Sequence, residues 1–408
     1  MQASSRWFFP LAALLSTTPL LAQTSSFQFL EKPGPYPIGL KVVDQYDHAR
    51  TFPSSSKDSA KPSVKEGPRP LQTLIWYPAV QSTSKPMTVG DYAKLADTEV
   101  RFDTPHPEQN KWRSQLQASS DVPLWALRDA KAASGRYPVL IYAPSDSSIS
   151  WENADLCEFL ASHGYVVLAS PSMGISTRDM TDDLEGINAQ ARDISFLITY
   201  AKTLGDTDSS EVAVVSWSWG GISSLFAAAR DPRIHALAAM DGSMRYFPGL
   251  VQKAGDVHPE RMDTPLLFFT SEYPNFLEDF EKYSDGPPAD RIGPNVLNAW
   301  LHGDLFTVNM LGMAHGEFSS MFQRRKNALR FAEDQIADYG RDDANTSHAW
   351  VARYTLNFLD AYLKRDAAAE AFLKRTPAEN GVPKHFMAAS FRVAQPAHPP
   401  KASAPASP

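Results

Sequence analysis

The most constraining feature of this sequence is an apolar, β-branched run over residues 212–215 that leads into Ser216-Trp217-Ser218-Trp219-Gly220-Gly221. The apolar residues that follow recur at helical spacing: Ile222, Leu225, Phe226 and Ala229. A strand, a sharp turn and a helix in this order predict a nucleophile elbow, with the hydroxyl of Ser218 exposed on the turn. The turn needs small residues two positions before and after the nucleophile. Gly220 meets this need, and Ser216 stands where glycine is usual. An ordinary buried strand followed by a Ser/Gly turn is the alternative.

Other strand-length apolar runs alternate with helical patterns along the chain. Strands are predicted at 34–43, 71–78, 138–143, 165–170, 235–240, 265–270 and 305–310, and helices at 151–163, 184–201 and 351–362. This alternation predicts an α/β fold: a mostly parallel central sheet with helices on both faces. The first two strands could pair antiparallel at one end of the sheet. Residues 51–69, rich in Ser, Lys and Pro, predict a surface loop. Residues 82–136 fit either short helices forming a lid or side insertion, or a decorated surface loop.

The two ends of the chain differ from its middle. Arg6, the apolar residues 7–15 and a possible cleavage site after Ala22 predict a signal peptide over 1–22, and hence an exported protein, periplasmic or secreted. The rival, an uncleaved anchor, needs a longer unbroken apolar run. We expect one large α/β domain over 27–394 and a disordered tail over 395–408.

Charge and cysteine content exclude some classes of protein. The net charge of -7 is spread along the 408 residues, so no basic surface for nucleic acid is expected. Cys157 is the only cysteine, which excludes a disulfide within the chain; we expect a buried, unreactive thiol. The sequence has no metal-ligand motif and no phosphate-binding glycine loop, so we expect neither metal nor cofactor.

A serine nucleophile needs a histidine as base and an acid that orients it, and in this fold the chain order is Ser, acid, His. Two acids end strands after Ser218. These are Asp241 and Glu272, and the spacing leaves them nearly even. Among ten histidines, His315 directly follows the strand at 305–310, which is where the base belongs. His302, His348 and His163 fit less well.

The oxyanion of the tetrahedral intermediate needs amide donors. We expect one from Trp219, the residue after the nucleophile. The other should come from the glycine-free loop 144–148, with the amide of Asp146 as the candidate. The carboxylate of Asp146 would oppose an anion unless it points away.

Several stretches together resemble the plasma-type platelet-activating factor acetylhydrolases and their bacterial, dienelactone-hydrolase-like relatives, which have the α/β-hydrolase fold. The matching pieces occur in the family's order over about residues 34–364: Gly34-Pro35-Tyr36, Tyr137-Pro138-Val139, Leu160-Ala161-Ser162-His163-Gly164, the elbow, Leu237-Ala238-Ala239-Met240-Asp241, residues 265–273 and the strand before His315. The resemblance implies a serine esterase with Ser218 as nucleophile, Asp241 as acid and His315 as base, and it favours Asp241 over Glu272.

The expected function is hydrolysis of a small-molecule carboxylic ester through an acyl-enzyme. The resemblance implies a short acyl group, and phospholipids are among the esters that it implies as substrates. A peptidase or polyester hydrolase with the same triad is one alternative, and a catalytically silent binding protein on the same fold is another. The sequence gives no oligomeric state. Residues 244–248, near the predicted site, could contact a membrane or equally belong to the core.

Overall fold

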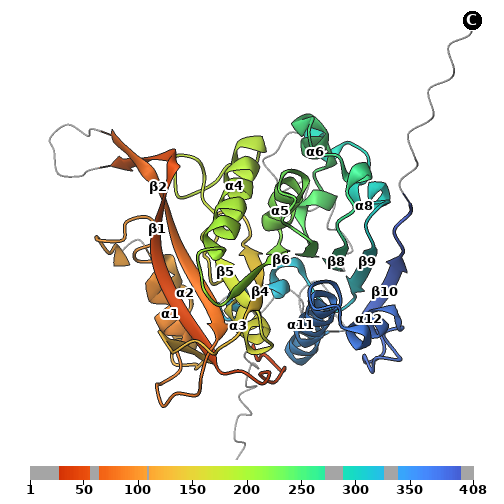
Figure 1. Ribbon diagram of the computed structural model, residues 1–408, viewed down its shortest axis with the longest axis horizontal. Helices are drawn as coiled ribbons and strands as arrows, with labels where there is room; N and C mark the ends of the chain where they lie inside the picture. The colour runs from red at the N-terminus through yellow and green to blue at the C-terminus, as the bar shows by residue number, and fades with distance from the viewer. Residues whose placement is uncertain (1–26, 56–63, 108–109, 272–287, 326–338, 397–408) are drawn as a thin grey trace, which may run out of the picture.

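A computed structural model describes residues 27–55, 64–107, 110–271, 288–325 and 339–396 (Figure 1). The predicted signal peptide at 1–22 lies outside the described residues, as does the predicted tail at 395–408 apart from its first two residues. Ten strands form one sheet in the order β10-β9-β8-β7-β6-β4-β5-β2-β1-β3. Their bounds are β1 Ile38–Ser55, β2 Val64–Pro78, β3 Ala126–Arg128, β4 Tyr137–Ala143, β5 Val166–Ala169, β6 Thr207–Trp217, β7 Ala236–Met240, β8 Leu266–Ser271, β9 Leu305–Met310 and β10 Met387–Arg392.

Strands β4 to β9 pair in parallel, and their side chains are almost wholly buried. Alternate residues of each strand enter two separate apolar clusters. In β4, for example, Leu140 packs into one cluster and Ile141 into the other. A strand buried on both faces accounts for the continuous apolar runs in the sequence. The predicted α/β architecture, a mostly parallel sheet covered on both faces, is therefore confirmed.

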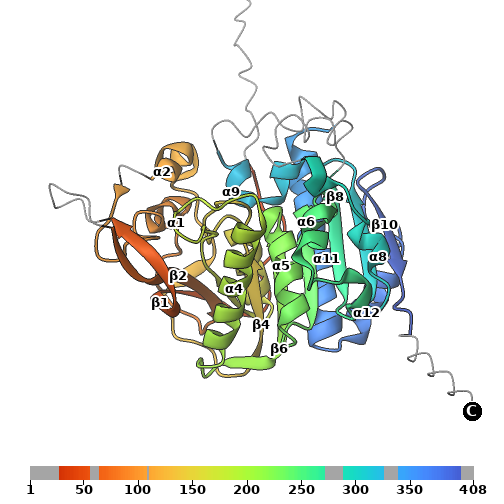
Figure 2. The ribbon, with the colours of Figure 1, turned by 90° about the horizontal axis from the view of Figure 1, so that it is seen from above.

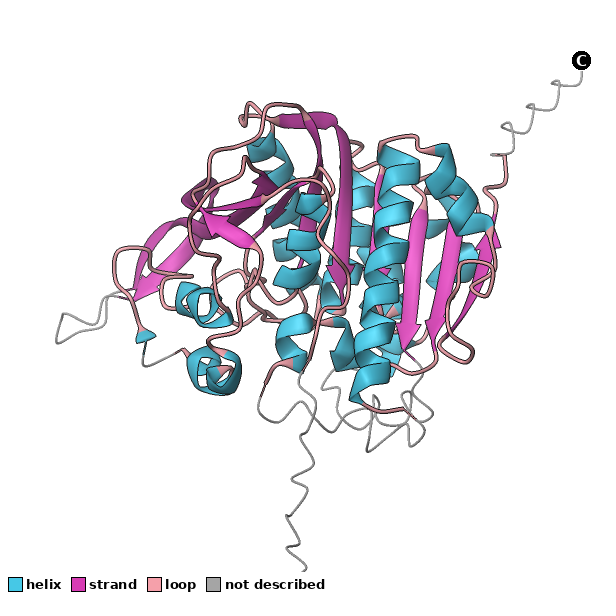
Figure 3. Cartoon of the chain, turned by 90° about the horizontal axis from the view of Figure 1, so that it is seen from below, coloured by secondary structure: helices cyan, strands magenta, loops and turns pink. Residues whose placement is uncertain are grey.

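Helices cover both faces of the sheet (Figures 1 and 2). One face carries α4 (Leu184–Ala201), α5 (Trp219–Arg230), α6 (Pro248–Ala254) and α8 (Val296–Ala299), and the other carries α3 (Ala154–Ser162), α11 (Arg341–Leu363) and α12 (Ala367–Lys374). Figure 3 shows these layers from below. Among the described residues, no helix is both long and apolar enough to cross a membrane.

The antiparallel end of the sheet is larger than the sequence indicated. The predicted pairing of the first two strands is correct, but they run through most of the predicted loop at 51–69, with Ser55 opposite Val64. Only Leu74, Ile75 and Trp76 of β2 pair with β5, so the far half of the hairpin extends past the parallel strands. At the other end, β10 adds an antiparallel strand that the sequence analysis missed.

Residues 82–136 contain short helices and a strand rather than a bare loop. Helices α1 (Val89–Leu95) and α2 (Lys111–Gln115) lead to β3, which pairs in parallel with β1 at the sheet edge. The ring of Trp112 in α2 packs against Trp151 and against Phe322 of the short helix α9 (Ser320–Gln323). This segment therefore packs against the chain that follows His315.

Candidate active site

Ser218 lies on a strained turn between β6 and α5. Its backbone φ of 54° falls in a region that residues other than glycine rarely adopt, as expected of a nucleophile elbow. A Cβ at Gly220 would lie 2.2 Å from the carbonyl oxygen of Ala143, so only glycine fits there. Ser216 is fully buried and its Oγ lies 3.3 Å from the carbonyl oxygen of Ala238. The serine in place of glycine is therefore accommodated without opening the turn.

The structure brings Ser218, His315 and Asp241 into one hydrogen-bonded chain. His315 Nε2 lies 2.9 Å from Ser218 Oγ, and His315 Nδ1 lies 2.7 Å from Asp241 Oδ2. Asp241 directly follows β7, and His315 opens the short 3₁₀ turn after β9. Neighbouring parallel strands end at the same edge of the sheet, which is why residues far apart in the chain meet here.

Asp241 is completely buried, whereas the His315 side chain remains 32% exposed. Burial by itself would raise the pKa of Asp241. The hydrogen bond and charge of His315, with hydrogen bonds from Ser271 and Tyr246, outweigh burial and hold that pKa below its usual range. Asp241 is therefore ionised at neutral pH and can stabilise a positive charge on His315.

Three residues around this chain were missed by the sequence analysis. Tyr246 OH donates to Asp241 Oδ1 and Ser271 Oγ donates to Asp241 Oδ2, each at 2.6 Å. Trp217 Nε1 donates to the carbonyl oxygen of His315 at 3.1 Å. The only sequence signals were that Tyr246 lies in the apolar segment 244–248 and Ser271 ends a strand. In that segment Met244 and Phe247 are buried, so its alternative interpretation as core is correct.

The two predicted oxyanion donors lie in elements that touch each other. Trp219 is the first residue of α5, where an N–H has no acceptor within the helix. In the facing loop the N–H of Ser145 donates to Glu152 Oε1 and that of Ser148 donates to Ser172 Oγ. Within the described part of the chain, the N–H of Asp146 has no such partner.

The side chain of Asp146 is exposed, yet the protein around it and the nearby acid Asp182 raise its pKa to about 6. Its Oδ1 lies 3.3 Å from Ser147 Oγ. At neutral pH this carboxylate is mostly charged, beside a place where the proposed reaction would develop negative charge.

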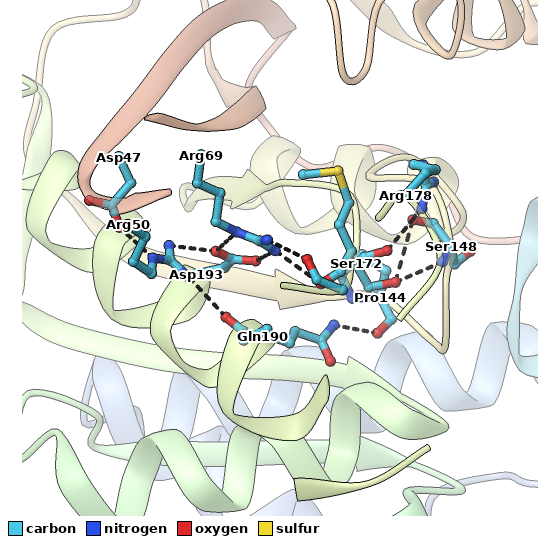
Figure 4. Close-up of polar contacts among 12 residues, drawn as sticks. Asp47, Arg50, Arg69, Pro144, Ser148, Ser172, Arg178, Gln190 and Asp193 are labelled. Carbon is cyan, nitrogen blue, oxygen red and sulfur yellow. Dashed lines mark hydrogen bonds and ion pairs between the residues drawn. The ribbon is translucent and has the colours of Figure 1, made fainter. Parts of the chain in front are cut away.

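A network of side chains holds the loop 144–148 from behind (Figure 4). Gln190 Nε2 of α4 donates to the carbonyl oxygen of Pro144 at 2.7 Å. Arg178 donates to the carbonyl oxygens of Ser172 and Ser148. One turn further along α4, Asp193 pairs with Arg69 of β2 at 2.7 Å. Side-chain contacts thus fix a loop in which no glycine occurs.

The other residues that the sequence offered as candidates have different outcomes. Glu272, the alternative acid, lies outside the described residues. His302 and His163 are half-buried; His302 Nδ1 contacts the carbonyl oxygen of Gln395, and His163 is the C-cap residue of α3. His348 is buried inside α11, and burial lowers its pKa to about 4. No cluster of metal-binding side chains occurs among the residues that the structure describes.

A parallel sheet with helices on both faces, and a serine at the elbow after β6, define the α/β-hydrolase fold. Among solved structures, 790 chains are similar to this one. One is a ferulic acid esterase from Streptomyces cinnamoneus, with a TM-score of 0.60, 18% sequence identity, and coverage of 90% of this chain and 99% of that chain. The likeness shows a shared fold. The sequence matches no family model and no curated protein.

Proposed function

We propose that this chain is an exported serine hydrolase that cleaves carboxylic esters through an acyl-enzyme. The observation that carries the proposal is the hydrogen-bonded chain from Ser218 through His315 to the buried Asp241, at a nucleophile elbow. The ferulic acid esterase that shares the fold supports the same reaction class. Export is proposed from the sequence pattern at 1–22.

In the proposed reaction His315 Nε2 takes the proton of Ser218 Oγ as this oxygen attacks the ester carbonyl. Asp241 holds His315 in the correct tautomer and stabilises its positive charge. The amides of Trp219 and Asp146 donate to the oxyanion. His315 then returns the proton to the leaving alcohol, and water releases the acid from Ser218 by the same steps.

We propose short-acyl esters, of the acetylhydrolase type, as the substrates, because of the family resemblance in the sequence. A cleft of about 620 Å³ borders Ser147 of the loop 144–148, but neither Ser218 nor His315 lines it, so it does not bear on the acyl length. A panel of p-nitrophenyl esters from acetyl to long acyl chains, with a peptide and a polyester, tests this. Highest kcat/KM on long chains, peptide or polyester would overturn the short-acyl proposal.

The direct test of the reaction is Ser218→Ala, which should lower turnover of p-nitrophenyl acetate by about a million-fold while leaving the fold intact. Undiminished hydrolysis by that variant would contradict the assignment. Asp241→Asn should be nearly inactive, and Glu272→Gln much less affected. The reverse order would move the role of acid to Glu272.

The second candidate function is a binding protein without catalysis, and the observation that raises it is the glycine-free loop 144–148 together with Ser216 in place of glycine. A fluorophosphonate probe separates the two. Labelling of the wild-type protein at Ser218, and not of Ser218→Ala, supports an enzyme. A folded wild-type protein that resists the probe supports the binding protein.

A further inference from the structure

Glu152 carries a fully buried carboxylate that the proposed mechanism does not use. It lies just before α3, behind the loop 144–148. Its Oε1 accepts from the Ser145 N–H at 2.8 Å and from Tyr142 OH at 3.0 Å, and its Oε2 accepts from Ser145 Oγ at 2.8 Å. Both hydrogen-bond donors of Ser145, its N–H and its hydroxyl, are thus bound to the side chain of Glu152.

Glu152 and its neighbour Asn153 also bind the part of the chain that follows His315. The carbonyl oxygen of Glu152 accepts from Ser319 Oγ at 2.6 Å and from the Met321 N–H at 3.1 Å. The side chain of Asn153 donates to the carbonyl oxygen of Phe318 at 2.8 Å. The start of α3 therefore contacts both the oxyanion loop and the segment that carries the base.

A carboxylate in such a place is costly. Burial raises the pKa of Glu152 to about 7, although the hydroxyls and the amide around it oppose that rise. An apolar side chain of similar size would fill the space without this cost. Buried polar groups with several fixed partners are common where geometry must be controlled, as at active sites.

The contacts also decide which amides remain for a substrate. Pro144 has no N–H, Ser145 gives its N–H to Glu152, and Ser148 gives its N–H to Ser172. Among the described residues, the N–H groups of Asp146 and Ser147 are then left without a protein acceptor, and that of Asp146 directly follows the residue that Glu152 holds.

We propose that Glu152 is the positioning residue of the oxyanion hole: by binding the Ser145 N–H and Oγ, it fixes the loop so that the Asp146 N–H faces the oxyanion. The inference rests on the proposed function and names the residue that acts on the oxyanion donor. Glu152 itself touches no substrate.

Two substitutions separate acceptor geometry from mere packing. Glu152→Gln keeps an oxygen for the Ser145 N–H and Tyr142 OH, and its amide can donate to Ser145 Oγ. Glu152→Leu fills the space and removes every acceptor. Glu158→Leu is the matched control, because Glu158 is a buried carboxylate on α3 that binds Tyr92 OH and the Trp125 N–H, away from the loop.

The readouts are kcat and KM for p-nitrophenyl acetate, and the inhibition constant of a trifluoromethyl ketone, which forms a tetrahedral oxyanion on the serine. Glu152→Leu should lower kcat about a hundred-fold, the typical effect of losing one oxyanion donor, with KM changed less than about three-fold. The inhibition constant should rise by a similar factor as kcat falls. Glu152→Gln should stay within about five-fold of wild type, and Glu158→Leu should lose thermal stability but not kcat.

A wild-type kcat in folded Glu152→Leu would overturn the inference, as would equal losses in Glu152→Gln and Glu152→Leu. If Glu152→Leu does not fold, Ser145→Ala provides the test, because it removes one of the two contacts: kcat should fall several-fold at constant KM, and an unchanged kcat would overturn the inference. Failure of the proposed function looks different. In that case the wild-type protein fails to react with the fluorophosphonate probe, or Ser218→Ala retains hydrolysis.

Discussion

The hydroxyl of Tyr246 is one of three donors to the buried carboxylate of Asp241. Removing a donor from a buried charge costs about 1–3 kcal/mol, because the lost contact is not replaced by water. We expect Tyr246→Phe to lower kcat/KM roughly ten-fold and to lower the free energy of unfolding by a similar 1–3 kcal/mol. Steady-state kinetics and urea unfolding measure the two effects. Tyr200→Phe is the control, since Tyr200 lies on α4, away from Asp241. Unchanged kinetics would show that Ser271 and His315 suffice to hold Asp241.

The side chain of Asp146 should make the rate of the proposed reaction depend on pH. Its pKa of about 6 means that the carboxylate is neutral in acid and charged above pH 7, where it opposes the oxyanion. Asp146→Asn keeps the backbone amide and removes the charge. We expect its kcat to exceed that of wild type by a few-fold at pH 8 and the ratio to approach one below about pH 5. Because the side chain is exposed, added salt should reduce the difference at pH 8. A ratio independent of pH would contradict this role of the charge.

The sequence pointed to the proposed triad of Ser218, Asp241 and His315, but not to the residues that hold it in place. Ser218, Asp241 and His315 each follow a predicted strand, and parallel strands place such residues at one edge. Sequence spacing alone did not separate Asp241 from Glu272. The roles of Tyr246 and Ser271 depend on the folded structure. Tyr246, in the segment after β7, and Ser271, at the end of β8, both donate to the carboxylate of Asp241, and the sequence does not show that they meet there. Glu152 was hidden in a helical pattern, since its partners are the preceding loop and a hydroxyl on β4.

At the scale of elements, the two elbow positions that call for a small residue, Gly220 and Ser216, should respond differently to substitution. A side chain at Gly220 would collide with the backbone of Ala143 and Pro144, the start of the oxyanion loop. Gly220→Ala should therefore abolish activity and destabilise the protein by more than about 2 kcal/mol, because backbone rather than a side chain must move. Gly205→Ala, where no atom lies within 4 Å of the added Cβ, is the control.

Ser216, by contrast, should be replaceable. Its hydroxyl makes only long contacts, 3.3 Å to the carbonyl oxygen of Ala238 and 3.4 Å to Ser224 Oγ. We expect Ser216→Gly to retain kcat within about three-fold and to lose about 1 kcal/mol of stability from the added freedom of the unfolded chain. A large gain in kcat would instead show that this serine restrains the elbow.

The strands with continuous apolar runs were predicted correctly, whereas the outer half of the β1–β2 hairpin and the strand β10, which have mixed sequences, were not. Strands β4 to β9 are buried on both faces and so have a clear pattern. The hairpin of β1 and β2 extends beyond the parallel strands, so its outer residues are polar and resemble a loop. In β10, Ala388, Ala389 and Ser390 are exposed, and the pairing with β9 rather than apolar content makes it a strand. Edge strands depend on partners that sequence periodicity does not reveal.

At the scale of the whole molecule, two buried acids make the free energy of unfolding depend on pH. They are Glu152, just before α3, and Glu158, on α3. Glu152 has a folded-state pKa of about 7, above the ordinary value of 4.5, so between these values the folded chain binds a proton that the unfolded chain has lost. The free energy of unfolding therefore falls as the pH rises from 4.5 to about 7, and Glu152 accounts for up to about 3 kcal/mol of this fall. Glu158, at about 8, acts in the same direction.

We expect Glu152→Gln to gain stability over wild type as the pH is raised from 5 to 8, measured by denaturant unfolding at each pH. The buried His348 acts with the opposite sign between about pH 4 and 6.5, but it is present in both proteins and cancels in the comparison. A stability difference that stays constant from pH 5 to 8 would show that Glu152 does not take up a proton on folding.

The lone thiol of Cys157 gives this molecule an internal reporter of its own opening. It lies fully buried on α3, between Glu152 and Glu158, and burial together with these acids raises its pKa well above the ordinary value. A thiol reagent such as DTNB should leave the native protein untouched at pH 8 and react only with molecules in which α3 has separated from the sheet. The labelling rate against denaturant would thus measure local opening beside the active site without any engineered probe. By the same reasoning, a disulfide between the Cys157 thiols of two chains can form only after α3 has separated from the sheet in both.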